Sequence, residues 1–457
     1  MDNKGRLPWG YRWRSSKSFI ISTIIIALFT ETFLYGFVVP ILGYMLEDRL
    51  RMDPSKTLRM TTVVQTLHGF MSLVSAPVIA HFADRTPNRK VPLLLSLAGS
   101  LVGTLLVAST LSIDTLFVGR VLQAVSGSAT WIVGFATLSD NISHEQMGKT
   151  VGLAMAFVTA GQVSGPMAAG ILLELVGYWP TWGAPILVLL LDMIARRLMM
   201  ERREHHSSPS TKPATRRESE DPERSALLPP SSPDQSPTTQ LGSSRSFYRT
   251  MLSDVRVLAS LANTLVFSTI VSAFDATLPL HLRDVFHWNT LSVGMIFLTL
   301  QVPSMCLGPL IGWLRDRVGV RVPVTIGWVL MAPLLWLLGV PGEKHFPWAS
   351  PQTNGEAIFI ASLIGIGMVY TLVRGAGTLQ LMAVTKVMES KNPKIFGEFG
   401  GSSRVFSMTE VAFSLGSMLG PLIAGSLSEV IGYYYMNIIL AAISLLLAWA
   451  TFRYFQV

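Results

Sequence analysis

The sequence is poor in charge. Asp, Glu, Lys and Arg together make up 14% of its 457 residues, whereas a soluble domain carries about 25%. This balance excludes an ordinary water-soluble enzyme. Half of the residues are apolar and the mean hydropathy is +0.45, so about twelve membrane spans of ~20 residues joined by short loops would fit this length.

Cysteine and histidine are also scarce. Cys306 is the only cysteine, which excludes a disulfide framework and a cysteine-based metal site. The 8 histidines are scattered along the chain, so we expect no metal centre, no cofactor and no membrane-embedded enzyme site. No cleavable signal peptide is expected, because the basic start runs directly into an apolar segment of span length.

Twelve apolar runs are long enough to cross a bilayer, so the sequence predicts twelve transmembrane helices. The sixth run is the weakest of them, because it is short and ends in Asp192, Arg196 and Arg197. The tenth run is overlong and contains Arg374. The predicted spans are residues 19–44, 60–82, 91–111, 116–138, 151–175, 182–200, 257–280, 291–314, 322–340, 357–384, 405–427 and 433–452.

Lys and Arg lie mostly on one side of these spans. With the amino terminus inside, most of the 36 Lys and Arg fall in the N-terminal tail and in the loops after even-numbered spans, as the positive-inside rule requires. We therefore expect both termini in the cytoplasm. The net charge of +8 then reflects membrane topology and does not indicate a nucleic-acid partner.

Residues 201–250 differ in composition from the rest of the chain. They hold 11 Ser and 7 Pro and show no apolar periodicity, which predicts a disordered cytoplasmic linker. The remaining predicted domains are an N-terminal tail (1–18), an N-terminal six-helix half (19–200) and a C-terminal six-helix half (251–457). Within the linker, residues 223–228 have the acidic-dileucine spacing of a vesicle-sorting signal, for which a chance match is the alternative.

The two halves repeat each other. Residues 161–178 align with 416–433, and residues 76–90 align with 308–322. Such a duplication is the build of an alternating-access carrier, whose halves rock about a central site, and it excludes a seven-span receptor. The matched pairs include Gly161/Gly416, Gly165/Gly420, Pro166/Pro421, Gly170/Gly425, Gly177/Gly432, Asp84/Asp316, Arg85/Arg317 and Arg89/Arg321.

Three motifs resemble signatures of the major facilitator superfamily. The loop signature G-x-x-x-D-R-x-G-x-R-R is matched twice, with Ala80 and Pro87 replacing glycines in the first copy. The resemblance implies an all-α integral membrane protein with twelve transmembrane helices in two pseudo-symmetric six-helix halves around a central cavity. The matching residues of the loop signature are Asp84, Arg85 and Arg89, then Asp316, Arg317 and Arg321. Arg120, Gln123 and Gly127 resemble the R-x-x-Q-G signature, with Ala124 where its first glycine is usual, and Gly161, Gly165, Pro166 and Gly170 resemble an element associated with proton-coupled exporters.

These motifs have physical interpretations. An acid beyond a helix end, followed by basic residues, can bond neighbouring helix ends and lock the halves in one state. We therefore interpret the two Asp-Arg loops as gates, with positive-inside anchoring as the alternative. Small residues and proline predict close helix packing and a bend, without ligand contact; they are Gly161, Gly165, Pro166 and Gly170, and in the second half Gly416, Gly420 and Pro421.

Charges inside spans are candidates for functional sites, because each costs roughly 2.5 to 3.5 kcal/mol on insertion scales. Glu31, Arg120, Asp275 and Arg374 fall one each in the first, fourth, seventh and tenth spans, which by resemblance line the cavity. Glu31, near the midplane, is the leading proton or cation site, because proton uptake there can compete with a cationic substrate. Asp275 and Arg120 are expected to pair when the cavity is closed to the outside. Static buried ion pairs are the alternative for all four.

The first span also resembles that of vesicular amine carriers and their fungal multidrug relatives. Glu31, Asp275 and Glu410 stand where those carriers have acids, whereas Tyr370 replaces a further acid. The fungal-type exporter is therefore the closer likeness.

The predicted function is a proton-coupled antiporter that exports a drug, toxin or secondary metabolite. Its partners would be a small, possibly cationic molecule, protons and the lipid bilayer, with no nucleic acid, and it would work as a monomer. The alternatives are a vesicular or vacuolar amine-type antiporter and a nutrient importer that uses proton symport. We expect the plasma membrane, with a vacuolar or vesicular membrane as the alternative.

Overall fold

The structure is a computed structural model that describes residues 10–85, 90–110, 112–141, 144–199, 249–350, 353–391 and 402–455. These residues form helices, turns and loops, with no strand among them. Within these ranges, twelve helical segments are long and apolar enough to cross a membrane, so the predicted all-α membrane fold is confirmed. Residues 1–9 of the predicted tail and 201–248 of the predicted linker, with its dileucine-like stretch, lie outside the described residues.

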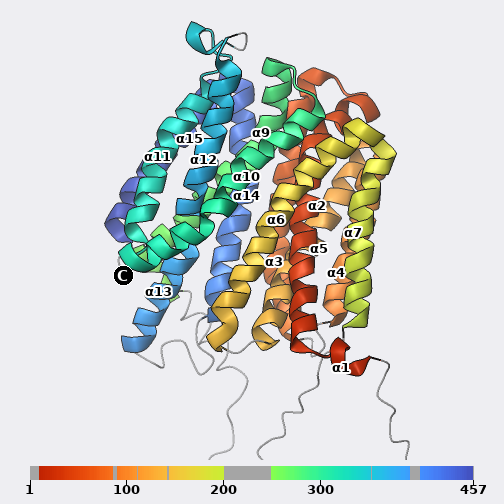
Figure 1. Cartoon of the computed structure of the whole chain (residues 1–457), viewed down its shortest axis with the longest axis vertical. Helices are drawn as coiled ribbons and strands as arrows, with labels where there is room; N and C mark the ends of the chain where they lie inside the picture. The colour runs from red at the N-terminus through yellow and green to blue at the C-terminus, as the bar shows by residue number, and fades with distance from the viewer. Residues whose placement is uncertain are drawn as a thin grey trace, which may run out of the picture.

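Two helical bundles stand side by side (Figure 1). The predicted spans match the helices to within two helical turns, but the overlong tenth span is two helices, α12 and α13. The N-terminal half consists of α2 (Lys17–Tyr44), α3 (Thr57–Arg85), α4 (Lys90–Ser109), α5 (Ile113–Asn141), α6 (His144–Val176) and α7 (Tyr178–Leu198). The C-terminal half consists of α9 (Val255–Phe286), α10 (Thr290–Val318), α11 (Arg321–Gly339), α12 (Gly355–Val373), α13 (Ala376–Lys391), α14 (Ser402–Ile431) and α15 (Tyr433–Tyr454).

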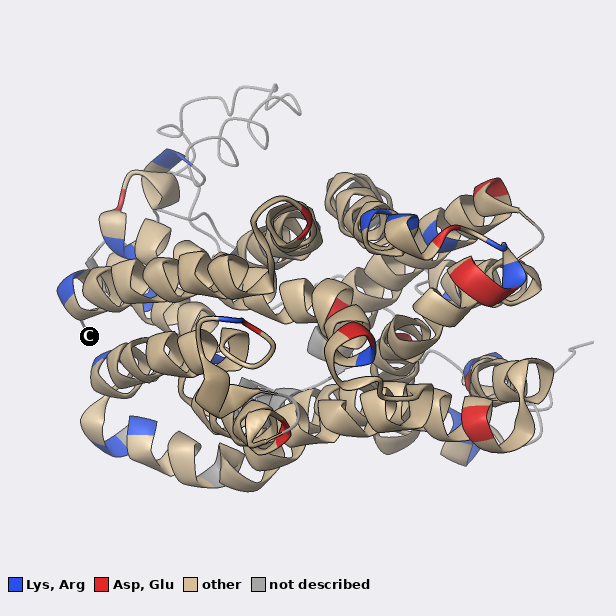
Figure 2. Cartoon of the chain, turned by 90° about the horizontal axis from the view of Figure 1, so that it is seen from above, with Lys and Arg blue, Asp and Glu red and all other residues tan. Residues whose placement is uncertain are grey.

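The two ends of the bundle are called the α1 face and the η1 face. The α1 face carries the short helix α1 (Tyr11–Arg14) and the start of α2. The η1 face lies opposite, where α2 continues into the π-helical turn η1 (Met45–Arg49) and the chain enters α3 through the 3-10 turn η2 (Pro54–Lys56). A view from above shows most of the ribbon free of charged residues (Figure 2), as expected for helices that pack in a bilayer.

Glycines at repeated positions bring helices together in the same way in both halves. A methyl group on Gly165 would lie 2.5 Å from the carbonyl oxygen of Phe33 on α2, and one on Gly420 would collide with the carbonyl oxygen of Thr269 on α9. Gly161 and Gly416, one turn earlier on α6 and α14, pack on the same two helices. The first helix of each half therefore packs tightly on the fifth, as the sequence predicts for small residues at this spacing.

The next glycines of the repeat join the two halves to each other. A methyl group on Gly170 of α6 would lie 2.6 Å from the carbonyl oxygen of Thr290 and 3.1 Å from Cα of Gly294, both on α10. At the matched position on α14, a methyl group on Gly425 would collide with Thr62 of α3. These contacts lie toward the η1 face, so the halves are packed together there.

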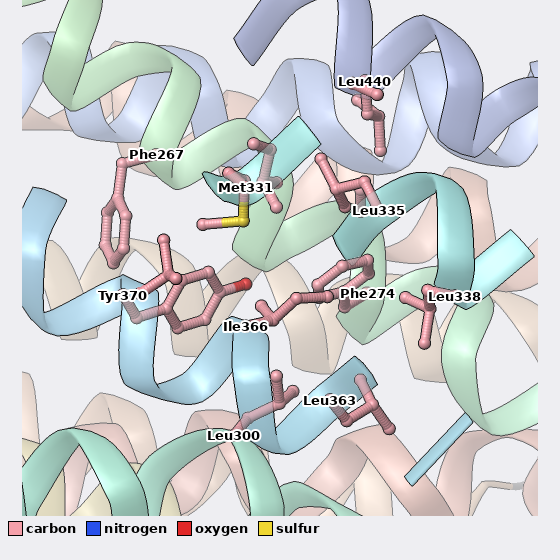
Figure 3. Close-up of a cluster of buried hydrophobic side chains, with 14 of the residues drawn as sticks. Phe267, Phe274, Leu300, Met331, Leu335, Leu338, Leu363, Ile366, Tyr370 and Leu440 are labelled. Carbon is pink, nitrogen blue, oxygen red and sulfur yellow. The ribbon is translucent and has the colours of Figure 1, made fainter. Parts of the chain in front are cut away.

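The C-terminal half has an extended apolar core. Phe274 of α9, Met331 and Leu335 of α11, and Leu363 of α12 are all buried in it, and Figure 3 shows these side chains gathered between the helices. Tyr370 joins this cluster and brings the one oxygen atom among the labelled side chains (Figure 3). This core thus packs side chains of α9, α11 and α12 together.

Candidate functional site

Three of the five ionisable residues predicted to bind protons or substrate come together. Glu31 lies on α2, Arg120 on α5 and Asp275 on α9, and the Arg120 guanidinium is within electrostatic range of both carboxyl groups. Arg374, directly after α12, and Glu410, on α14, lie outside this group. We call Glu31, Tyr35, Arg120 and Asp275 the central cluster.

Arg120 is fixed inside the N-terminal half. Its side chain is fully buried, and its Nη1 and Nη2 atoms donate hydrogen bonds to Oε1 of Gln123 and of Gln65, each at 3.0 Å. Gln123 in turn donates to Oγ1 of Thr104 at 3.0 Å. The guanidinium therefore donates to two amides instead of forming the predicted direct pair with Asp275, and it acts on that carboxyl through its field.

A hydrogen bond in the central cluster joins the two halves. The hydroxyl of Tyr35 on α2 donates to Oδ2 of Asp275 on α9 at 3.1 Å. The Tyr35 ring packs against the His68 ring at 5.3 Å between centroids, and Arg120 lies 5.9 Å from the centre of the Tyr35 ring. Tyr35 could not be singled out from the sequence, because nothing along the chain places a hydroxyl opposite an acid of the other half.

The absence of a side chain at Gly127 makes room for Glu31. A methyl group at this position of α5 would collide with the Glu31 carboxyl group. Glu31 itself is half-buried on an otherwise closely packed stretch of α2. Gly127 thus lets the carboxyl group lie directly beside α5, in range of Arg120.

A second set of polar groups extends from the central cluster toward α6. Tyr370 on α12 is buried, and its hydroxyl is within electrostatic range of both Asp275 and Arg374. Arg374 donates from Nη2 to Oε1 of Gln162 on α6 at 2.9 Å, which is another bond between the halves. Glu410 is half-buried on α14.

An ion pair connects the halves at the η1 face. Nη1 of Arg283, near the end of α9, lies 2.7 Å from Oε1 of Glu47 in η1, and Thr57 donates to the same carboxylate oxygen at 2.6 Å. A cavity lies between the halves beside this pair, lined by Thr61, Leu280, Arg283 and neighbouring residues. We call the Glu47–Arg283 pair the η1 latch.

The predicted gating loops are only partly described. Asp84 and Arg85 form the end of α3, but their side chains lie outside the described part of the structure, as do Arg89 and the side chain of Asp316. The guanidinium of Arg317 lies 4.4 Å from the Trp313 ring centre, and that of Arg321 lies 4.5 Å from the Phe452 ring centre. The gating role of these loops stays a prediction.

The described residues contain no group of three or more His, Cys, Asp or Glu side chains that could hold a metal ion. The site therefore offers titratable carboxyl groups, arginines and tyrosines. Such groups can bind protons and a polar or charged molecule.

Comparison with known proteins agrees with this architecture. The family model described as Major Facilitator Superfamily matches residues 24–391. The chain is 31% identical over 423 residues to an uncharacterized MFS-type transporter of Schizosaccharomyces pombe, covering 91% of each chain. It is 24% identical to the vesicular acetylcholine transporter of Rattus norvegicus, over 83% of this chain and 63% of that one. A crystal structure of the nucleoside transporter NupG has the same fold, with a TM-score of 0.61 at 14% identity, covering 96% of this chain and 99% of that chain.

Proposed function

Because the chain belongs to the major facilitator superfamily, and is therefore a membrane transporter and not an enzyme, we propose that it exports a small organic molecule in exchange for protons. The Tyr35–Asp275 bond carries this proposal. It places an acid of one half against a hydroxyl of the other, beside a buried arginine. A proton-dependent contact between the halves is what an alternating-access antiporter requires.

The proposed coupling follows from the chemistry of a carboxyl group. An ionised Asp275 accepts a strong, charge-assisted bond from the Tyr35 hydroxyl, whereas a protonated Asp275 accepts a weaker one. Glu31, beside Gly127, is the group that a proton and a cationic substrate would occupy in turn. In this scheme Arg374 and Glu410 line the path toward the α1 face, and protons need no further cofactor.

The conformation supports a direction for the cycle. The halves meet at the η1 latch and at Gly170 and Gly425. In this proposal the α1 face lies in the cytoplasm, because basic residues gather at that end, and the substrate enters from there while the halves are closed at the η1 face. The Asp84 and Asp316 loops would lock the opposite, outward-facing state.

We propose a monomer in the plasma membrane, with both termini cytoplasmic. A cationic substrate is favoured by Glu31 and Asp275, and by the similarity to a protein named for carrying acetylcholine, an organic cation. A vacuolar or vesicular membrane would suit the same chemistry, since export into a vesicle lumen has the same polarity.

The function is tested with purified protein in liposomes. The lumen is made acidic, and uptake of ethidium, a permanent organic cation, is compared with uptake of anionic fluorescein. Antiport predicts that protons leaving the lumen drive ethidium inward and that fluorescein stays outside. Uptake driven only when the outer solution is acidic would contradict antiport and indicate an importer.

The η1 latch gives a second prediction. Glu47→Arg places two like charges together and should loosen the η1 face, which is read as faster maleimide labelling of Thr61→Cys in a Cys306→Ser background. The expected increase is about threefold to fivefold, because a half-exposed pair contributes at most about 1 kcal/mol; the side chains of Arg283 and Glu47 are 35% and 21% exposed.

A rescue variant and a control variant make this test specific. Restoring opposite charges with Glu47→Arg plus Arg283→Glu should return labelling to the parent rate. Arg51→Glu, an exposed charge reversal in the same loop, should leave labelling unchanged. The latch is refuted if the double variant labels as fast as Glu47→Arg alone.

A further inference from the structure

The tenth span is broken between α12 and α13. Helix α12 ends at Val373, Arg374 is extended (φ −61°, ψ 131°) and Gly375 has φ +70°, a value that glycine adopts without strain. A helix end leaves its last carbonyl groups without donors. Within a membrane protein such groups must find other partners.

Two side chains supply donors at this helix end. Nη2 of Arg315, in the last turn of α10, lies 2.9 Å from the carbonyl oxygen of Thr371, 2.9 Å from that of Leu372 and 3.1 Å from that of Arg374. Nδ2 of Asn263 on α9 donates to the carbonyl oxygen of Val373 at 3.3 Å. The last three carbonyl groups of α12 and that of Arg374 therefore face these two side chains, and the two hydrogens of Nη2 are shared among three of the four. We call Arg315 and Asn263 the α12 cap.

The α12 cap is itself held in place. Oδ1 of Asn263 accepts a hydrogen bond from Nε1 of Trp328 at 2.8 Å, and this tryptophan of α11 is fully buried. Gly327, next to it, lets α11 approach the end of α12, since a methyl group there would lie 2.7 Å from Cγ1 of Val373. Helices α9, α10 and α11 thus all converge on the end of α12.

The charge of the cap suits its position. Broken helices in carriers can bind coupling cations at the negative end of the half-helix. Here a guanidinium of the chain itself stands at that end, so a metal cation would have to displace Arg315. This agrees with a carrier that uses protons.

The break aims Arg374 at the other half. Its backbone N–H still bonds to the carbonyl oxygen of Tyr370 at 2.8 Å, while its side chain leaves the helix and reaches Gln162 on α6. After the break, α13 packs in a separate apolar cluster with the starts of α9 and α14, through Leu381 and Val384. The conformation of the turn at Arg374 and Gly375, which the α12 cap stabilises, therefore sets the direction of the Arg374 side chain.

We propose that Arg315 is a positioning residue: by capping α12 it holds the 374–375 turn so that Arg374 contacts Gln162 across the two halves. The inference rests on the proposed role of Arg374 in transport. Arg315 has no separate signal in the sequence, because it stands beside Asp316 and Arg317 in a basic loop motif.

The cap is tested first without transport. In a Cys306→Ser, Ala376→Cys background, the new cysteine replaces a buried residue of the first turn of α13. Arg315→Gln should raise its labelling by a water-soluble maleimide at least about tenfold, the factor expected when charged hydrogen bonds are lost. Arg315→Lys, which keeps the charge but not the guanidinium, should fall in between. Arg453→Gln, an exposed arginine at the end of α15, is the matched control and should label as the parent does.

A double-mutant cycle then tests positioning. If Arg315 acts through Arg374, Arg315→Gln and Arg374→Gln should each lower ethidium transport, and the double variant should transport no worse than Arg374→Gln alone. Arg315→Lys should recover part of the loss. Losses that multiply in the double variant overturn the proposal, and so does unchanged labelling of the introduced cysteine in Arg315→Gln. Normal transport by Arg374→Gln overturns the transport role of Arg374 and not the cap, which the labelling decides independently.

Discussion

Replacing Glu31 with glutamine should reduce proton-driven transport to the level of empty liposomes. Glutamine keeps the size of the side chain beside Gly127 but cannot take up or release a proton, so the coupled cycle cannot be completed. Exchange of external for internal ethidium without a pH gradient should persist, because the halves can still move while the site stays occupied. The measurement is ethidium flux in liposomes, with and without an imposed pH gradient.

The control for this variant is Asp48→Asn. Asp48 is an exposed acid in η1, at the end of the same helix, and its loss should leave proton-driven flux unchanged. Proton-driven flux by Glu31→Gln at the wild-type rate would show that this carboxyl does not carry the coupled proton.

Removing one partner of the Asp192–Arg196 pair should strongly destabilise the folded protein. The two side chains are 0% and 1% exposed, with 3.5 Å between Arg196 Nε and Asp192 Oδ1 on adjacent turns of α7. Arg196→Leu leaves a buried carboxylate without its partner, and such a change costs about 3 to 5 kcal/mol. The free energy of unfolding in mixed detergent micelles measures it.

Two further variants make the result specific. Replacing both residues with leucine should recover most of the loss, because an apolar pair of similar volume needs no desolvation of charge. Arg197→Gln, the exposed neighbour, should be close to neutral. Equal stability of Arg196→Leu and Arg197→Gln would mean that the buried pair contributes nothing.

This pair also shows what sequence reasoning missed. Asp192 and Arg196 made the sixth span the weakest of the twelve predicted, because the hydropathy of a segment counts each charge as a cost. In the structure they neutralise each other one helical turn apart, inside the protein and away from lipid. The spans themselves were predictable, since length and apolarity alone define them, and so was the twofold repeat.

The predicted charged residues were harder to place. Counting residues along the first span put Glu31 near the midplane, but it could not show that the Glu31 and Asp275 carboxyl groups both lie in range of Arg120. The partners of these groups come from other helices: Tyr35 for Asp275, and Gln65 for Arg120. Contacts of this kind depend on helix rotation and tilt, which packing against neighbouring helices decides and a single sequence does not display.

The break in the tenth span has the same origin. An overlong apolar run with one arginine was visible in the sequence, but a continuous helix and a broken one fit that run equally well. In the structure the helix is broken, because Gly375 adopts a positive φ and because Arg315 and Asn263 donate hydrogen bonds to the end of α12.

The direct test of proton antiport is to follow protons while substrate moves. Liposomes containing the wild-type protein are loaded with ethidium and a trapped pH indicator, with no initial pH gradient, and diluted into ethidium-free buffer. Antiport predicts that the lumen acidifies as ethidium leaves, because protons enter in exchange. Ethidium efflux with a constant luminal pH, or with a rise in luminal pH, would contradict it.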